Sequence, residues 1–362
     1  MNKRILTILT ALCLTGALAG CGTGNPGSVP ASSQPAPETT VGTTAPPTTS
    51  PPTQPKGDFN IFTGEDSLAA GADTRPVAVM IGNNDKSRPQ YGLDQADMYV
   101  EAETEGGITR IMAVFANAAR VPAQLGPVRS ARSPFALLAQ SLDAVYCHAG
   151  GSTAGLATVK NLGIHHIDGL VYDGSTFWRD ANLKRTKGLE YSMMTSGDKL
   201  GARMKSANIR RNGKLTSLFT FGEGAGSGAG KTVQVFFSGA QTISFQYDAG
   251  TGLYTKYNGV VGKGSPHKTA GGKALTASNV LVLYDTKYAE NAYTIGFNLK
   301  SGGGLLVSGG TSRPVSWSRS SSKLSITEKD GSPAKMATGK TYICLVSKGN
   351  EGNTKVDRKS VV

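Results

Sequence analysis

Apolar and polar residues follow two patterns along the chain, and the change falls near residue 212. Before it, the short apolar run Val77–Ile81 is typical of a buried strand. Met98–Glu103 alternates between an apolar and a polar face. Glu105-Gly106-Gly107 then gives a turn signal before the next apolar run, Ile108–Phe115. This pattern predicts a buried strand followed by a β-hairpin.

Helix-start signals alternate with these strands. Serine and threonine suit the N-cap because their side chains accept a bond from a free backbone N–H, and proline suits the first helical position. Glycine pairs mark the turns between elements. The expected elements are helices from Ser133-Pro134 to Leu142, from Ser152 to about Leu162 and from near Thr195, with a strand at Ala144–His148 between the first two.

Beyond residue 212 the pattern favours strands only. Turn signals such as Asn258-Gly259, Gly302-Gly303-Gly304 and Asp330-Gly331 separate the apolar runs, and no helical period appears. The predicted fold class is α+β, with a mixed α/β domain at 58–212 and an all-β domain at 231–350, a sandwich or partly open barrel. Residues 213–230 are expected to form a linker or long loop, and 351–362 a polar tail. The expected strands are Val233–Phe237, Ile243–Tyr247, Leu253–Tyr257, Val280–Tyr284, Tyr293–Leu299, Leu305–Val307, Val315–Ser318, Leu324–Ile326 and Tyr342–Val346.

The first twenty residues have the form of an export signal. Lys3 and Arg4 precede the apolar run Ile5–Leu14, and Leu18-Ala19-Gly20-Cys21 follows. This order predicts a lipoprotein signal at 1–20, with cleavage before Cys21 and a lipid on its sulfur; the alternatives are a short membrane anchor or an ordinary secretory signal. Residues 21–57 form a tether, since nine of the 17 prolines of the chain fall there and such a composition cannot bury a core.

Charge narrows the choice of partners. The formal net charge is +13, or +11 once Lys3 and Arg4 leave with the signal. A basic protein attracts anionic partners, and export excludes nucleic acid from them. Cys147 and Cys344 remain after processing, each in a strand-like apolar run. We expect both to be buried and unpaired, although a disulfide is possible outside the cytosol.

Several stretches together carry a family resemblance. They are RPVAVMIGNNDKSRPQYGLDQADMYVEAETEGGITRIMAVF (75–115), LGPVRSARSPF, DAVYCHAGGS, IDGL and FWRD, with weaker matches in HKTAGGKALTASNV, PVSW, DG and GKTYI. In them the chain resembles the YerB-like lipoproteins of Gram-positive bacteria, a family without an established biochemical function. The resemblance implies an exported lipoprotein with a mixed N-terminal and a β-rich C-terminal domain. The chain departs from it at Leu189–Ser196, where relatives tend to have His-Asn-Leu-Tyr-Thr-Ser.

Two glycine-containing segments precede helix starts and suggest an anion site. Gly126–Arg132 brings two arginines to a helix N-terminus, where free N–H groups and the helix dipole favour an anion. His148–Ser152 is a second such segment. Alternatively, the arginines pair internally with Asp97, Glu101, Glu103 or Glu105. The candidate ligand-binding residues are Arg110, Arg129, Ser130, Arg132, His148 and Ser152.

Other side chains offer weaker candidates. Asp97, Glu103 and Glu105 are a possible acidic site for glycan cleavage. Trp178 beside a charge pair suits sugar stacking, although a core position explains it equally. The histidines at 148, 165 and 166 have no carboxylate or cysteine at ligand spacing, so no metal and no cofactor are expected.

We therefore expect a lipid-anchored protein on the extracytoplasmic face of the cell membrane, which binds or scaffolds an envelope polymer or an envelope protein. The alternative is an envelope glycan hydrolase, and the sequence does not decide whether the protein is an enzyme. An unpaired Glu103 or Asp97 in an open pocket would favour the hydrolase. Arginines bonded to the acids in a closed core would favour binding.

Overall fold

The computed structural model describes residues 59–223, 226 and 228–360. The predicted signal peptide, Cys21 and the tether lie outside these residues. Within the described residues, no helix has both the length and the apolar character needed to cross a membrane. The α-helices are α1 Ser133–Ser141, α2 Thr153–Leu162, α3 Ala181–Lys187 and α4 Gly197–Ser206. The 3-10 helices are η1 Asp85–Ser87, η2 Leu93–Gln95, η3 Glu105–Gly107, η4 Ala118–Arg120, η5 Leu189–Tyr191 and η6 Lys348–Asn353.

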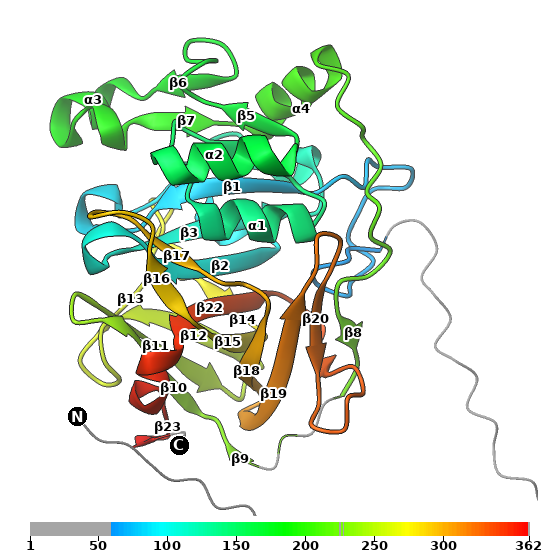
Figure 1. Ribbon diagram of the computed structural model, residues 1–362, viewed down its shortest axis with the longest axis vertical. Coiled ribbons are helices and arrows are strands. Elements are labelled where there is room, and N and C mark those ends of the chain that lie inside the picture. Colours follow the sequence, from blue (N-terminus) through cyan, green and yellow to red (C-terminus); the bar gives the residue numbers. More distant parts are fainter. Residues whose placement is uncertain (1–58, 224–225, 227, 361–362) are drawn as a thin grey trace, which may run out of the picture. The chain divides into compact units, whose positions relative to one another are not determined.

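A central sheet of 11 strands runs through the fold, in the order β20-β19-β18-β15-β22-β2-β3-β1-β4-β5, with β9 added to β19 (Figure 1). The hairpin β2–β3 packs against β1 on one side and β22 on the other. The strands are β1 Val77–Gly82, β2 Met98–Glu103, β3 Thr109–Phe115, β4 Val145–His148, β5 His166–Asp168, β9 Gly228–Ala229, β15 Asn279–Asp285, β18 Ser301–Ser308, β19 Thr311–Arg319, β20 Leu324–Thr327 and β22 Thr341–Ser347.

The pairing directions determine which strand ends meet. β1 is parallel to β4, and β4 to β5. Both β1 and β2 are antiparallel to β3, and β2 is parallel to β22. The carboxyl ends of β1, β2, β4, β5 and β22 therefore lie along one edge of the sheet, which we call the carboxyl edge. The opposite edge, where these strands begin, is the amino edge.

Both faces of the central sheet are covered, which explains why β1, β2, β3, β4 and β15 are buried throughout. On one face, Ala78 and Met80 pack with residues of α1 and α2, which lie side by side over the strands (Figure 1). On the other face, Val79 and Ile81 share a cluster with α4 and with a second sheet. Alternate residues of one strand thus serve two different cores.

The second sheet is antiparallel and has seven strands. Its apolar residues, such as Val235 and Phe245, pack on the central sheet. Residues of the predicted polar tail take part in it, since β23 pairs with β10. Its strands are β10 Thr232–Ser238, β11 Gln241–Asp248, β12 Leu253–Asn258, β13 Ser265–Pro266, β14 Thr276–Ala277, β23 Lys355–Val356 and β24 Lys359–Ser360. The small sheets pair β6 Phe177–Arg179 with β7 Met193–Thr195, β8 Thr220–Phe221 with β21 Lys335–Met336, and β16 Lys287–Ala289 with β17 Ile295–Phe297.

The predicted α+β class, with a mixed N-terminal part and a β-rich C-terminal part, is confirmed. Both sequence segments contribute to the central sheet, because β22 of the C-terminal segment lies beside β2. The domain boundaries stay a prediction. Cys147 and Cys344 are free and buried, as expected.

One local prediction was wrong. The glycine run at 302–304 lies inside β18 instead of a turn. A Cβ at Gly302 would lie 2.8 Å from Nε1 of Trp317, so glycine permits the close approach of this ring. The helix expected from near Thr195 is confirmed as α4. It is capped by Ser196, which accepts a bond from the backbone N–H of Lys199, and Thr195 ends β7.

Candidate functional site at the carboxyl edge

The segment Gly126–Arg132 runs along the carboxyl edge between the ends of β1 and β4. On one side, the backbone N–H of Arg129 donates to Met80 O at 2.8 Å. On the other, the N–H of Ala131 donates to Gly150 O at 2.9 Å. The two glycine-containing segments predicted as anion sites are therefore neighbours in space, and Arg110, near the start of β3, lies at the same edge.

Arg110 and Arg132 share one carboxylate. Nη2 of each lies within 2.6 Å of Glu105 Oε1, and Arg132 Nε donates to Oε2 at 2.8 Å. Arg110 also approaches Ser130 O at 3.4 Å, so Ser130 contributes its carbonyl. The arginine side chains are 3% and 9% exposed, whereas that of Glu105 is 29% exposed. The cluster therefore contains two buried positive charges and one partly exposed negative charge.

This arrangement shifts two pKa values. Burial, with the nearby charge of Arg132, lowers the pKa of Arg110 to about 10. Burial also disfavours the Glu105 carboxylate, but the bond from Arg132 and the charge of Arg110 outweigh it, so the pKa of Glu105 is lowered. Near neutral pH all three groups are charged, and the excess positive charge remains.

Arg129 has a different and more open setting. Its Nη1 donates to Glu190 O at 2.7 Å and its Nη2 to Glu190 Oε2 at 3.2 Å. The Glu190 side chain is 73% exposed. The guanidinium carbon lies 4.8 Å from the centre of the Tyr191 ring, and Lys86 Nζ lies 5.9 Å from the same centre. The Arg129 side chain is 15% exposed, and it is held between an aromatic ring and one largely exposed acid.

His148 and Ser152 bond within the fold. His148 is buried, with Nδ1 2.8 Å from Gly150 O and Nε2 3.1 Å from His166 Nδ1. Burial lowers the pKa of His148 despite Asp168, whose carboxylate lies 4.0 Å away, so the ring is neutral near pH 7. Ser152 caps α2 by accepting a bond from the Gly155 N–H at 3.0 Å. Both side chains therefore stabilise the local backbone structure at the carboxyl edge.

The candidate acids are all paired. Asp97 is fully buried and accepts two bonds from Arg120 Nε, at 2.9 and 2.8 Å. Glu103 accepts from Lys287 Nζ at 2.8 and 3.1 Å. Asp97 precedes β2 and Glu103 ends it, which places them about 20 Å apart at ~3.3 Å per residue. Paired glycosidase carboxylates lie about 5–9.5 Å apart, so these two cannot act together on one bond.

Trp178 lies on β6, half-buried, with Lys199 Nζ 5.8 Å from its ring centre. One face of the Trp178 ring therefore has a cation nearby. A role of Trp178 in sugar stacking stays a prediction. Within residues 59–223, 226 and 228–360, no group of three or more His, Cys, Asp or Glu side chains is arranged to hold a metal ion.

A buried polar network between the two sheets was missed from the sequence. Glu101 is fully buried and accepts from Asn83 Nδ2 at 2.9 Å, Thr109 Oγ1 at 2.6 Å and Tyr342 OH at 2.5 Å. Lys256, also fully buried, lies 3.6 Å from Glu101. Glu101 in β2 and Lys256 in β12 were a signal, but the alternation of β2 placed Glu101 on a polar face, which the second sheet in fact covers.

The network continues through a histidine. Lys256 Nζ donates to His267 Nδ1 at 2.9 Å, so the proton of the ring lies on Nε2, which donates to Gln90 Oε1 at 2.8 Å. Burial and the charge of Lys256 lower the pKa of His267 well below its ordinary value. The network joins residues of both sequence segments, and Glu101, Lys256 and His267 are all fully buried in it.

Comparison with known proteins agrees with the fold. Residues 62–210 match a family described as "Protein of unknown function (DUF3048) N-terminal domain", and residues 233–343 match its C-terminal domain. The chain is 30% identical over 282 residues to "Putative lipoprotein YerB" of Bacillus subtilis, which covers 76% of this chain and 82% of that protein. The crystal structure of YerB from Bacillus subtilis superposes with a TM-score of 0.68 at 26% identity, covering 80% of this chain and 96% of that one. The resemblance inferred from the sequence is thus confirmed, and the chain belongs to the DUF3048 family that includes YerB.

Proposed function

We propose that the protein is a lipid-anchored binding protein on the extracytoplasmic face of the cell membrane, which recognises an anionic group of an envelope ligand through the arginines of the carboxyl edge. The lipoprotein signal ending at Cys21 and the likeness to a lipoprotein support the anchor. The proline-rich composition of 21–57 predicts a tether, and a polyproline-like chain spans ~3.1 Å per residue, so a ligand in the envelope is expected to be within reach.

The proposal rests on the excess of positive over negative side chains at the carboxyl edge. Arg110, Arg129 and Arg132 meet one partly exposed acid, Glu105, and one largely exposed acid, Glu190. An exposed ion pair contributes only about 0–1 kcal/mol. A charge-assisted hydrogen bond to an anion contributes about 1.5–3 kcal/mol. A phosphate or carboxylate of a ligand can therefore displace Glu190 from Arg129 with a net gain.

The place in the fold supports the same conclusion. Open sheets with parallel strands usually bind ligands beyond the carboxyl ends of those strands. The buried pair Arg110 and Arg132 adds positive potential beside Arg129 without being exposed itself. The hydrolase alternative finds no support, because Asp97, Glu103 and Glu105 all bond to basic side chains.

The test is binding of a purified wall polymer that carries phosphodiester groups. Arg129→Ala should weaken binding about tenfold to hundredfold, because one charge-assisted interaction is lost, while the melting temperature stays the same. Arg313→Ala is the matched control. Its guanidinium also pairs with a glutamate, Glu328 at 2.9 Å, and it removes the same charge from β19. Unaltered binding by an Arg129→Ala protein that melts earlier would mean that Arg129 has only a structural role.

A further inference from the structure

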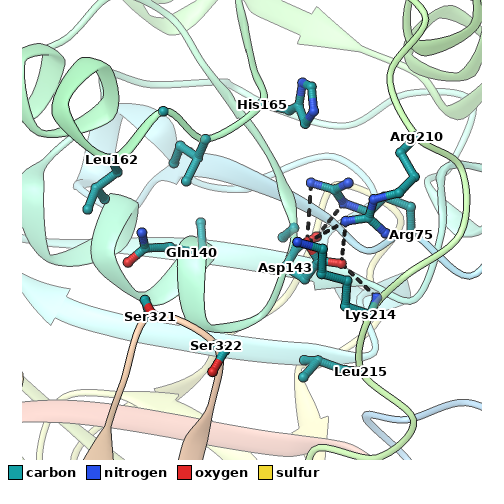
Figure 2. A pocket seen from close by; sticks show the side chains of 14 residues that line it. Arg75, Gln140, Asp143, Leu162, His165, Arg210, Lys214, Leu215, Ser321 and Ser322 are labelled. Carbon is teal, nitrogen blue, oxygen red and sulfur yellow. Dashed lines mark hydrogen bonds and ion pairs between the residues drawn. The ribbon is translucent and has the colours of Figure 1, made fainter.

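A cavity of about 320 Å³ lies at the amino edge, away from the arginine cluster. It is lined where strands begin: Arg75 precedes β1, Asp143 and Ala144 precede β4, and His165 precedes β5. Arg210, beyond the end of α4, closes one side. Figure 2 shows the charged side chains gathered on this side, with Gln140 and Leu162 facing them across the cavity. The volume falls in the range of small-molecule sites, about 300–1,000 Å³.

Arg75 has an unused donor. Its side chain is only 4% exposed, and Nη2 lies 3.5 Å from Asp143 Oδ1, while Nε donates to the carbonyl of Asp143. Nη1 is buried and has no hydrogen-bond partner among the described residues. Buried donors are nearly always bonded, because leaving one unpaired costs free energy. An anion in the cavity would offset the charge of this incompletely paired guanidinium.

The charges around the cavity do not balance. Arg210 Nη2 bonds to both oxygens of Asp143 at 2.7 Å, and the backbone N–H of Lys214 donates to Oδ2 at 2.8 Å. Among the described residues, Asp143 is the only acid that lines the cavity, against Arg75, Arg210 and Lys214. The carboxyl ends of α1 and α2 also face this region and contribute about half a negative charge each. About one positive charge remains.

We propose that this cavity binds a small organic monoanion, with its carboxylate beside the basic side chains of Arg75, Arg210 and Lys214 and an apolar body between the walls. The apolar lining consists of Ala139, Ala144, Leu162, Ile164 and Leu215. His165 stands at the rim in a neutral state, since burial and the charges of Arg75 and Arg210 lower its pKa. The site is separate from the arginines of the carboxyl edge, so it goes beyond the function proposed above.

The experiment is a titration of the detergent-solubilised lipoprotein with benzoate and with benzamide, which has the same shape and no charge, followed by calorimetry and ligand-observed NMR. Benzoate should bind at least tenfold more tightly than benzamide. Arg75→Gln should weaken benzoate about tenfold to hundredfold. Because Arg75 is buried, Lys214→Glu provides a second variant at an exposed position, and it should weaken benzoate without altering the fold.

Lys205→Glu is the matched control. Lys205 is exposed in the last turn of α4 and does not line the cavity, so the same change of charge there should leave binding intact. Equal binding of benzoate and benzamide, or benzoate binding that both Arg75→Gln and Lys214→Glu leave unchanged, would overturn the proposal. Tighter binding of phenyl phosphate than of benzoate would contradict the monoanion, because the site would then hold more than one excess positive charge.

Discussion

Replacing Lys256 by Met tests whether the buried network holds the two sheets together. Lys256→Met keeps a long side chain but removes the ammonium that lies 3.6 Å from Glu101 and 2.9 Å from His267 Nδ1. Glu101 keeps its bonds from Asn83, Thr109 and Tyr342 but loses its positive partner. The charge then remains in a fully buried position, where water cannot stabilise it.

The expected loss is about 3–5 kcal/mol in the free energy of unfolding, the usual effect of removing one member of a buried ion pair. This is a large share of the total stability of a folded domain, about 5–15 kcal/mol. The three bonds that Glu101 retains favour the lower end of the range. Removing the Lys256 donor also leaves His267 Nδ1 without a partner, which adds to the loss of stability.

Urea denaturation followed by tryptophan fluorescence measures this loss, since Trp317 is buried in β19 of the central sheet and reports on its unfolding. The double variant Lys256→Met/Glu101→Gln removes both charges. Its loss should be smaller than the sum of the two single losses by at least about 1 kcal/mol, because the unpaired charge is no longer present. A loss below 1 kcal/mol for Lys256→Met, or strictly additive losses, would show that the pair does not couple the sheets.

Two further predictions follow from the buried histidine and from the signal sequence. Since the folded protein holds His267 with a pKa well below that of the unfolded chain, the unfolded state binds more protons below about pH 6.5, and stability should fall as pH decreases from there. His267→Gln should flatten that slope by up to about 1.4 kcal/mol per pH unit in urea titrations between about pH 6.5 and 5.5; an unchanged slope would contradict a neutral His267. Cys21→Ala should abolish metabolic labelling with a fatty acid, and label retained by this variant would exclude Cys21 as the lipidated residue.

Part of the site was predictable because it depends on local sequence. The sequence predicted that Ser152 caps α2 and that Arg129 and Arg132 precede α1. These positions were predictable because capping and turn signals act over a few residues. Both glycine-containing segments meet at one edge because β1 and β4 are parallel neighbours, which the structure shows. The sequence also offered internal pairing of the arginines as an alternative, and Glu105 is the partner that Arg110 and Arg132 share.

The sequence by itself determined the elements: the hairpin β2–β3, helices α1 and α2, and the β-only pattern of the C-terminal segment. Apolar periodicity and turn residues encode these over short distances. Only the tertiary structure decided that Lys256 lies beside Glu101, and that Arg75, Asp143 and Arg210 enclose one cavity. Such contacts join residues far apart in the chain, so they depend on strand order, register and layer packing, which no local pattern specifies.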